Sequence, residues 1–318
     1  MVSKPTPIPN TEDMEFKEGF IKRYSALTDW EQFKTFSLSF LRRSIRINTL
    51  KTTIKETKES IEAKGWILDP IPWCKEGFWI RHTDRKDVGN LWEHHVGKIY
   101  IQEAVSMLPP LVLQPQPGDI VLDMCASPGS KTTQMAAMMQ NKGLLIANDY
   151  QGIRLQPLGI NLQRSGATNT IITLMSGTRF RDFQFDKILV DAPCSGTGTI
   201  RKSLKTIRIW NPSMVKKICR EQKRLATTAF NNLKPGGTMV YSTCSLEPEE
   251  NEGVIDYLLT TFPNATLEKI TLPGLKVGKP VTEFEGAIYN PQVKHTLRIW
   301  PQDNDTEGFF VAKIRKSA

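Results

Sequence analysis

Two cysteines, Cys194 and Cys244, are the residues of this chain whose setting most suggests chemistry. Each follows a short apolar run, Ile-Leu-Val before Asp-Ala-Pro-Cys194 and Met-Val-Tyr before Ser-Thr-Cys244. Such runs predict buried strands of a parallel sheet. If the two strands are neighbours, they lie about 5 Å apart and both sulfurs emerge at the carboxyl edge of the sheet, where open α/β folds bind ligands. Two thiols beside one ligand indicate covalent chemistry.

A second candidate site follows the strand predicted at 119–124. The segment Cys-Ala-Ser-Pro-Gly-Ser-Lys at 125–131 indicates a tight turn and a helix start, where nucleotide-like ligands bind. It is not a phosphate loop, because Cys125 and Ser130 stand where glycines are needed, and Gly-x-Gly-x-x-Gly is absent. Asp149 ends the next predicted strand, where an acid usually holds ribose hydroxyls; helix capping is its alternative role. A nucleoside without phosphate, such as S-adenosylmethionine, fits this pattern.

Alternating strands and helices from about residue 100 position these segments. The strands are predicted at 119–124, 143–149, 169–174, 186–191 and 237–242, and the helices at 129–140, 151–164, 212–233 and 247–261. Two further strands, at 295–298 and 309–314, are predicted to form a closing hairpin. We therefore expect an α/β fold with a doubly wound, Rossmann-like sheet over 96–318.

The first part of the chain, 1–95, is predicted to form a small α+β domain. Its basic cluster of Arg42, Arg43 and Arg46 could touch nucleic acid, which would give this domain a role in binding RNA. Its aromatic side chains could do the same, but we expect most of them in the core of the small domain.

The composition is that of an ordinary soluble globular protein, with 39% hydrophobic and 24% charged residues among 318. No apolar run approaches the roughly 18 residues of a membrane span, and the N-terminus lacks an apolar signal core, so we expect a cytoplasmic protein. Five cysteines without a Cys-x-x-Cys pair, together with four scattered histidines, favour reduced thiols and predict no metal site.

The net charge of +9 is concentrated in one stretch. Residues 201–235 contain ten Lys or Arg and a single acid, Glu221. This concentration favours a polyanionic substrate, although a solvated helix face is the alternative. The helix predicted at 212–233 has one apolar face at 3.6 spacing. Cys219 lies on that face and is expected in the core.

Together these segments resemble the Sun-type (Nol/Nop/Sun) RNA (cytosine-5)-methyltransferase family over roughly 95–318. The resemblance implies a class I methyltransferase that moves a methyl group from S-adenosylmethionine to C5 of a cytosine in structured RNA, transfer RNA before ribosomal RNA. The matching segments are Asp-Met-Cys-Ala-Ser-Pro-Gly-Ser-Lys-Thr-Thr-Gln at 123–134, Asn-Asp at 148–149 with Arg154, Asp-Ala-Pro-Cys-Ser-Gly-Thr-Gly at 191–198, and Ser-Thr-Cys-Ser at 242–245 before Glu-Glu-Asn-Glu at 249–252.

The resemblance also implies roles for single residues. Cys244 would be the nucleophile that forms a covalent adduct with C6, and Cys194 the thiol that helps to release the product. Asp191 and Lys131 would line the base pocket. One position departs from the family, which usually has an acid near the adenine where this chain has Ser176. The residues implied to bind the cofactor are Cys125, Ala126, Ser127, Pro128, Gly129, Ser130, Lys131, Asp149, Arg154, Ser176 and Asp191.

The chemistry explains why these residue types are needed. Carbon 5 of cytosine is too electron-poor to attack a methyl group until a thiolate adds to carbon 6, and cysteine forms such a thiolate readily. Asp191 could hydrogen-bond the nitrogen edge of the ring and compensate the charge that develops. Lys131 could add positive charge there or lower a thiol pKa; capping a helix is its structural alternative.

Two other functions compete with this one. In a DNA cytosine-5-methyltransferase the Pro-Cys cysteine attacks and a Glu-Asn-Val segment follows, but this chain has no Glu-Asn-Val and has a second cysteine instead. A non-catalytic RNA-binding assembly factor would keep the fold without turnover, and the intact cysteine pair argues against it.

Overall fold

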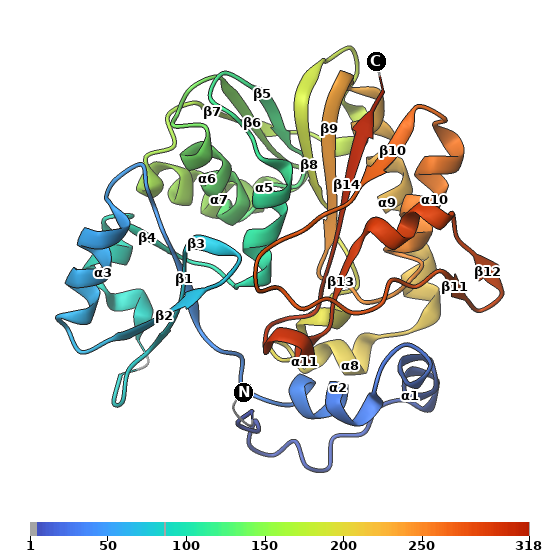
Figure 1. Cartoon of the computed structure of the whole chain (residues 1–318), viewed down its shortest axis with the longest axis horizontal. Helices are drawn as coiled ribbons and strands as arrows, with labels where there is room; N and C mark the ends of the chain where they lie inside the picture. The colour runs from blue at the N-terminus through green and yellow to red at the C-terminus, as the bar shows by residue number, and fades with distance from the viewer. Residues whose placement is uncertain (1–4, 86, 318) are drawn as a thin grey trace.

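The computed structural model describes residues 5–85 and 87–317, and two β-sheets organise this part of the chain (Figure 1). The larger sheet has the strand order β10-β14-β9-β8-β5-β6-β7, and β13 also pairs with β14. The strands from β9 to β7 are parallel, which confirms the expected doubly wound, Rossmann-like sheet. The strand bounds are β5 Ile120–Asp123, β6 Leu144–Asp149, β7 Thr170–Leu174, β8 Phe185–Asp191, β9 Leu233–Thr243, β10 Ala265–Glu268, β13 Leu297–Ile299 and β14 Phe309–Lys316.

The predicted C-terminal hairpin is confirmed, since β13 and β14 pair antiparallel. However, β14 is also inserted into the large sheet, antiparallel to both β9 and β10, so the sheet is mixed. The sequence pattern did not indicate this insertion, because local periodicity carries no information about pairing partners.

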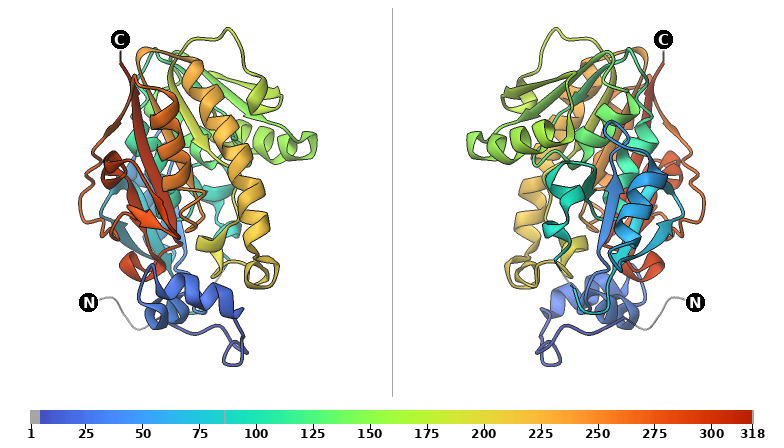
Figure 2. Two further views of the ribbon diagram at one scale, coloured as in Figure 1. Left: turned by 90° about the vertical axis from the view of Figure 1, so that its right-hand side faces the viewer. Right: turned by 90° about the vertical axis from the view of Figure 1, so that its left-hand side faces the viewer.

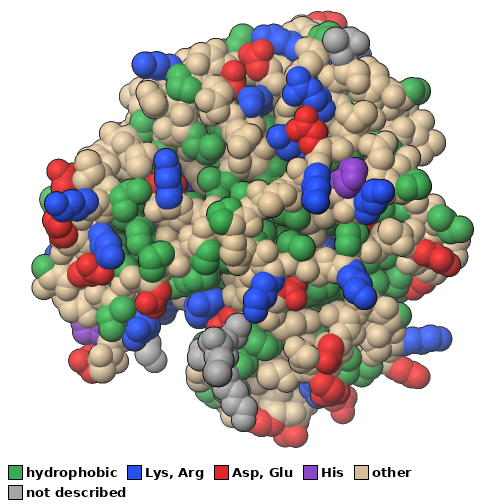
Figure 3. All heavy atoms as spheres, in the orientation of Figure 1, with side chains coloured by type: hydrophobic (Ala, Val, Ile, Leu, Met, Phe, Trp, Pro, Cys, Tyr) green, Lys and Arg blue, Asp and Glu red, His purple; other side chains and the backbone are tan. Residues whose placement is uncertain are grey.

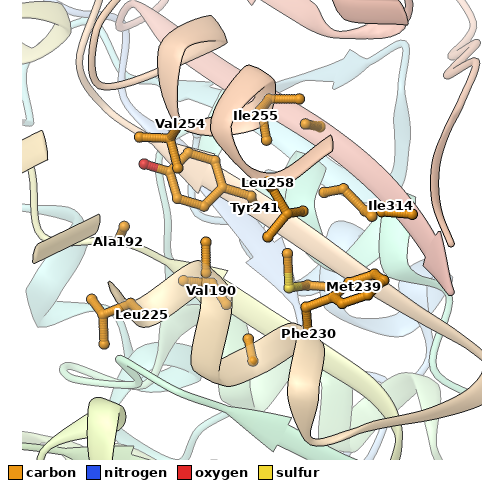
Figure 4. Close-up of a cluster of buried hydrophobic side chains, with 14 of the residues drawn as sticks. Val190, Ala192, Leu225, Phe230, Met239, Tyr241, Val254, Ile255, Leu258 and Ile314 are labelled. Atoms are coloured by element: carbon orange, nitrogen blue, oxygen red, sulfur yellow. The ribbon is translucent and has the colours of Figure 1, made fainter. Parts of the chain in front are cut away.

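Helices cover both faces of the large sheet (Figure 2). Alternate side chains of β9 enter the two resulting layers: Met239 and Tyr241 pack with α9 and α10, and Val240 packs with α5 and α6. Figure 4 shows the first layer, where Leu225 and Phe230 of α9 lie beside the strands. The helix bounds are α5 Leu108–Leu113, α6 Ser130–Met138, α7 Gly152–Ser165, α9 Pro212–Asn231 and α10 Glu252–Thr261.

The predicted helix at 247–261 begins only at Glu252. Residues 248–251 form turns instead, because glutamates of the segment 247–250 are committed to buried contacts. Glu247 accepts hydrogen bonds from Tyr24 and Trp210, and Glu250 accepts them from the backbone N–H of Ser195 and the side chain of Gln222. A regular helix from 247 would turn these side chains away from their partners.

The smaller sheet is antiparallel, with the order β2-β3-β1-β4. Trp66 and Phe78 are buried in the core of this smaller sheet, as expected, but Trp73 is buried in the core on one face of the large sheet and the partly buried Trp79 packs against that same core. The bounds in this part are β1 Ser44–Ile47, α3 Ile54–Glu62, β2 Ile67–Ile71, β3 Cys74–Arg81, α4 Trp92–His95 and β4 Ile99–Ile101.

The two helices before this sheet pack elsewhere. Phe20 and Tyr24 of α1 (Glu18–Ser25) and Phe33 of α2 (Trp30–Ser37) share a core with Trp210 and Trp300. Those tryptophans flank α8 (Lys205–Ile209) and α11 (Pro301–Asn304), both of which come far later in the chain. The division of the chain into 1–95 and 96–318 stays a prediction, and residues 1–4, 86 and 318 of these ranges lie outside the described residues.

A short antiparallel ribbon of β11 (Glu283–Phe284) and β12 (Ala287–Ile288) completes the described strands. Within residues 5–85 and 87–317, every helix is too short or too polar to cross a membrane.

Candidate functional site

The two cysteines of the sequence motifs meet at the carboxyl edge of the large sheet. Strands β8 and β9 are parallel neighbours, with Asp191 opposite Ser242, so the segments that follow them run side by side. The Sγ atoms of Cys194 and Cys244 lie 3.2 Å apart, and both side chains are partly exposed. The predicted adjacency of the two thiols is therefore confirmed. A hydrogen bond with Cys244 and burial raise the pKa of Cys194 well above its usual value, so Cys194 is a thiol at neutral pH.

An ion pair lies at the same edge. Nζ of Lys131 is 2.8 Å from Oδ2 of Asp191 and donates a second hydrogen bond, 3.0 Å long, to Oγ of Ser106. The other carboxylate oxygen of Asp191 accepts a hydrogen bond from Ser242. Burial by itself would lower the pKa of Lys131, but Asp191 outweighs burial and raises it. Lys131 is therefore a cation held in place by Asp191 and Ser106. Its amine points to Asp191 rather than capping α6.

The turn between β5 and α6 is tied to the start of α7. Gly129 has φ of 100°, a conformation that glycine adopts without strain. The hydroxyl of Ser127 donates to the carbonyl of Arg154, and the guanidinium of Arg154 donates to the carbonyl of Ser127, each over 2.8 Å. The side chain of Asn161 on α7 donates to the carbonyl of Pro128. These contacts set the shape of the turn that the sequence singled out.

A cavity of about 230 Å³ opens beside this turn. Four of the residues expected to bind a cofactor line it: Cys125, Asp149, Arg154 and Ser176. The expected stretch from Ala126 to Lys131 and Asp191 lies outside this lining. The remaining lining residues, which the sequence reasoning did not single out as site residues, are Met124, Asn148, Tyr150, Gly177, Pro193, Glu221 and Leu225.

Asp149 has two different carboxylate oxygens. Oδ1 accepts the backbone N–H of Gln151 at the entry to α7, so the capping alternative describes part of its role. Oδ2 is buried and has no hydrogen-bond partner among the described residues; Nε of Arg154 lies 3.5 Å from it. A buried acceptor facing a cavity is suited to a ligand that donates hydrogen bonds.

Some of the missed residues had a sequence signal and others had none. Asn148 stands next to Asp149 at a strand end, and its amide donates to the carbonyls of Met124 and Met175, which joins three strand ends. Glu221 and Leu225 come from α9, far along the chain, and only the tertiary structure brings them to the cavity.

A larger cavity of about 920 Å³ lies elsewhere, between the smaller sheet and α6. Arg46, Trp73 and Gln134 are among its lining residues, and it contains none of the expected site residues. In the described part of the chain, no three His, Cys, Asp or Glu side chains are grouped so as to hold a metal ion.

The basic stretch at 201–235 is only partly available to a ligand. Arg201 is buried, with its guanidinium 2.7 Å from Asp305, and Lys234 pairs with Asp186 at the same distance. On the molecular face of Figure 3, basic and acidic side chains are interspersed. The exposed bases of the stretch are Lys202, Lys205, Arg208, Lys216, Lys217, Arg220 and Arg224.

Comparison with known protein families identifies the group to which this architecture belongs. Residues 110–315 match the family described as 16S rRNA methyltransferase RsmB/F, and residues 16–104 match the N-terminal domain of 16S rRNA methyltransferase RsmF. The chain belongs to the RsmB/F family. This confirms the resemblance to Sun-type methyltransferases and the expected class I methyltransferase fold.

Three RsmB/F relatives and neighbours illustrate the match. The tRNA (cytosine(49)-C(5))-methyltransferase of Pyrococcus abyssi is 49% identical over 95% of this chain and 99% of its own length. The ribosomal RNA small subunit methyltransferase F of Shewanella oneidensis is 46% identical over 87% of this chain, which spans only 58% of that protein. The crystal structure of a methyltransferase homologue from Pyrococcus horikoshii superimposes with a TM-score of 0.85 at 38% identity, covering 95% of both chains.

The region that matches the RsmB/F family contains Cys194 and Cys244. It also contains the ion pair of Lys131 and Asp191. Ser106, which holds Lys131, lies in the short segment between the two matched regions. Arg46 lies within the N-terminal match and contacts α6.

Proposed function

We propose that this protein is an RNA (cytosine-5)-methyltransferase that transfers a methyl group from S-adenosylmethionine to C5 of a cytosine in structured RNA. The observation that carries the proposal is the meeting of Cys194 and Cys244, 3.2 Å apart, at the sheet edge that also presents the pair of Lys131 and Asp191. Transfer RNA is the favoured substrate, because the relative that matches over nearly its whole length is named for transfer RNA. Ribosomal RNA is second, because the Shewanella oneidensis relative named for it is less identical to this chain, at 46% against 49%.

The cavity beside the turn suits the cofactor. Oδ2 of Asp149, which has no hydrogen-bond partner in the described part of the chain, would accept hydrogen bonds from ribose hydroxyls, with Arg154 supporting the carboxylate. The turn at 125–131 would enclose the methionine part. Ser176 offers a hydroxyl to the adenine, and Glu221 supplies an acid to the same lining. When bound, S-adenosylmethionine supplies an electrophilic methyl group.

Cys244 is assigned as the nucleophile. Its sulfur would form a bond to C6 of the cytosine, which makes C5 nucleophilic enough to accept the methyl group. Asp191 and Lys131 would face the nitrogen edge of the ring, where charge develops as the sulfur adds. Their mutual ion pair and the hydrogen bond from Ser242 hold them in place before the base arrives. A preorganised pair of this kind needs no rearrangement during the reaction.

Cys194 is assigned to product release. Its raised pKa keeps it a thiol at neutral pH, so it does not compete with Cys244 for C6. A protonated thiol 3.2 Å away can also stabilise the Cys244 thiolate as the bond to C6 breaks. In the same phase a base from the solvent would accept the proton on C5, and the electron pair of that C–H bond would reform the C5–C6 double bond as the Cys244 thiolate leaves.

We further propose that residues 1–95 form an RNA-binding domain attached to a methyltransferase domain at 96–318. The exposed bases of α9 would bind phosphates next to the site. The target cytosine must leave its stack to reach the thiols, which favours looped or locally opened RNA.

The test is transfer of labelled methyl from S-adenosylmethionine to transfer RNA, ribosomal RNA and DNA, with nucleoside analysis. Wild-type protein should form 5-methylcytosine in RNA. Cys244→Ala should form neither product nor adduct, whereas Cys194→Ala should leave RNA covalently attached, visible as a band that survives denaturing electrophoresis.

Two outcomes would contradict these assignments. If Cys194→Ala forms no adduct and shows no turnover, Cys194 is the nucleophile and the two thiol assignments must be exchanged. RNA binding without methylation of any nucleic acid or affinity for the cofactor would support the assembly factor instead.

A further inference from the structure

A buried arginine joins the smaller sheet to the helix that carries Lys131. Arg46 lies on β1 and is 2% exposed. Its Nε donates to Oε1 of Gln102 over 2.8 Å, and its Nη2 donates to Oγ1 of Thr133 over 2.9 Å. The same Nη2 lies 3.4 Å from the carbonyl oxygen of Ser130. Arg46 thus contacts α6 on both sides of Lys131.

The position of this guanidinium is costly. The hydrogen-bond acceptors found for it among the described residues are neutral oxygens, of Gln102, Ser130 and Thr133, although a buried charge is normally paired. Burial lowers the pKa of Arg46 to about 10. Its cation also lies at the N-terminal turn of α6, where the helix dipole disfavours positive charge. An apolar side chain of similar volume would fill the site with a smaller desolvation cost, so stability alone does not explain an arginine here.

The hydrogen bonds continue from Arg46 to the base pocket. Gln102, which accepts from Arg46, donates to Oε1 of Gln134 on α6 and to the carbonyl of Ser106. Ser106 in turn accepts a hydrogen bond from Nζ of Lys131, which reaches Asp191. Two routes therefore lead from one arginine to one lysine: through the backbone of α6, and through Gln102 and Ser106.

We propose that Arg46 is a positioning residue, which holds Lys131 against Asp191 and makes the base pocket depend on the docking of the smaller sheet. The reaction served by this pocket rests on the proposed function; the positioning of Lys131 does not. A displacement of about 1 Å at a reacting centre can lower a rate by about 10²-fold, so the loss of this contact should be measurable.

The test compares Arg46→Met, which keeps the volume, with Arg46→Lys, which keeps the charge. The matched control is Ile61→Ala, a cavity in the core of the smaller sheet without a polar link to α6. The first readout needs no substrate: acetylation of Lys131 by acetic anhydride, followed by mass spectrometry and normalised to exposed Lys202. In Arg46→Met this acetylation rate should rise roughly tenfold. A lowering of the pKa of Lys131 by one unit, or an equivalent gain in the exposure of its amine, has an effect of that size.

The second readout is steady-state methylation. Arg46→Met should lower kcat by about 10²-fold and change the KM for the cofactor by less than about threefold, and Arg46→Lys should recover part of kcat. Ile61→Ala should lower the unfolding midpoint without changing Lys131 acetylation or kcat. The proposal is overturned if Arg46→Met loses stability as the control does while Lys131 acetylation stays at the wild-type rate. If the wild type methylates nothing, the proposed function fails, and the acetylation readout still decides the role of Arg46.

Discussion

At the scale of single residues, the site region contains a carboxyl group that is poorly compensated. Asp123 ends β5, directly before the turn at 125–131, and is 1% exposed. Oδ2 accepts a hydrogen bond from Thr132, but Oδ1 has no partner among the described residues. Burial, with a smaller contribution from Asp191, raises the pKa of Asp123 to about 7. The same burial that shapes the turn thus costs stability when this group is ionised.

The pH dependence of stability tests this point. In the unfolded chain an aspartate titrates near pH 4. Between about pH 4 and pH 7 the folded protein keeps the proton and the unfolded chain loses it, so the contribution of Asp123 to the free energy of unfolding falls as pH rises. Asp123→Asn should therefore be more stable than wild type at pH 8, by about 2–4 kcal/mol, and the difference should shrink toward pH 4.

Urea unfolding of both proteins at a series of pH values measures this difference. Asp84→Asn, at an exposed carboxyl group, is the control and should follow the wild type. If the free energy of unfolding changes equally with pH in wild type and Asp123→Asn, Asp123 is ionised in the folded protein throughout this pH range.

At the scale of elements, α9 combines three tasks. Its apolar face packs on the large sheet, and Cys219 lies there, as expected. The amide of Gln222 donates to the carbonyl of Pro193 over 2.9 Å and so supports the Cys194 segment. Its exposed face carries Lys216, Lys217 and Arg220. The helix thus presents positive charge on the element that also borders the thiols.

Neutralising that face should weaken RNA binding without changing the chemistry. Lys216→Gln, Lys217→Gln and Arg220→Gln combined should raise the Kd for RNA by about tenfold or more at low salt. The slope of the logarithm of the RNA association constant against the logarithm of the salt concentration should become shallower by about 2. Each lost phosphate contact reduces the steepness of this slope by about 0.7–0.9. The rate constant at saturating RNA should be unchanged.

Filter binding at several salt concentrations, together with single-turnover kinetics, checks this prediction. The control is a triple variant with the same loss of charge elsewhere on the surface, at Lys142, Lys279 and Lys294. If both triple variants lose the same affinity, α9 has no special role and only net charge matters.

At the scale of the whole molecule, one buried carboxylate joins distant parts of the chain. Glu247, three residues after Cys244, is inaccessible to solvent. It lies 2.7 Å from Nε of Arg23 on α1 and also accepts hydrogen bonds from Tyr24 and Trp210. Arg23 reaches Glu249 and Glu285 as well. The N-terminal helix is therefore part of the support of the loop that follows Cys244.

Breaking this pair should destabilise the protein strongly. Arg23→Met should lower the free energy of unfolding by about 3–5 kcal/mol, because it leaves the buried carboxylate of Glu247 without its cation. Glu247→Gln should lower it less, because Arg23 keeps its ion pairs with Glu249 and Glu285. The double variant should lose less than the sum, with a coupling energy of about 1–3 kcal/mol. Urea unfolding of the four proteins gives the cycle. The exposed pair of Lys58 and Glu62 is the control, and Lys58→Ala should cost less than about 1 kcal/mol; additive losses for Arg23 and Glu247 would contradict the coupling.

Much of the architecture could be predicted because it depends on local patterns of apolar and polar residues in the sequence. Short apolar runs predicted the parallel strands, and 3.6 periodicity predicted α9 and the burial of Cys219. The motif residues at strand ends were expected together because all parallel strands of one sheet end at one edge. For Cys194 and Cys244 this argument was sufficient, and their sulfurs meet.

What only the tertiary structure decided concerns partners far apart in the chain. The insertion of β14 beside β9, the burial of Arg201 against Asp305 and the contact of Arg46 with α6 have no local signature. An arginine in a basic stretch looks the same in sequence whether it faces water or a buried carboxylate. The difference lies in which surfaces dock, and docking depends on the shape and charge of both partners at once, whereas periodicity reports one segment at a time.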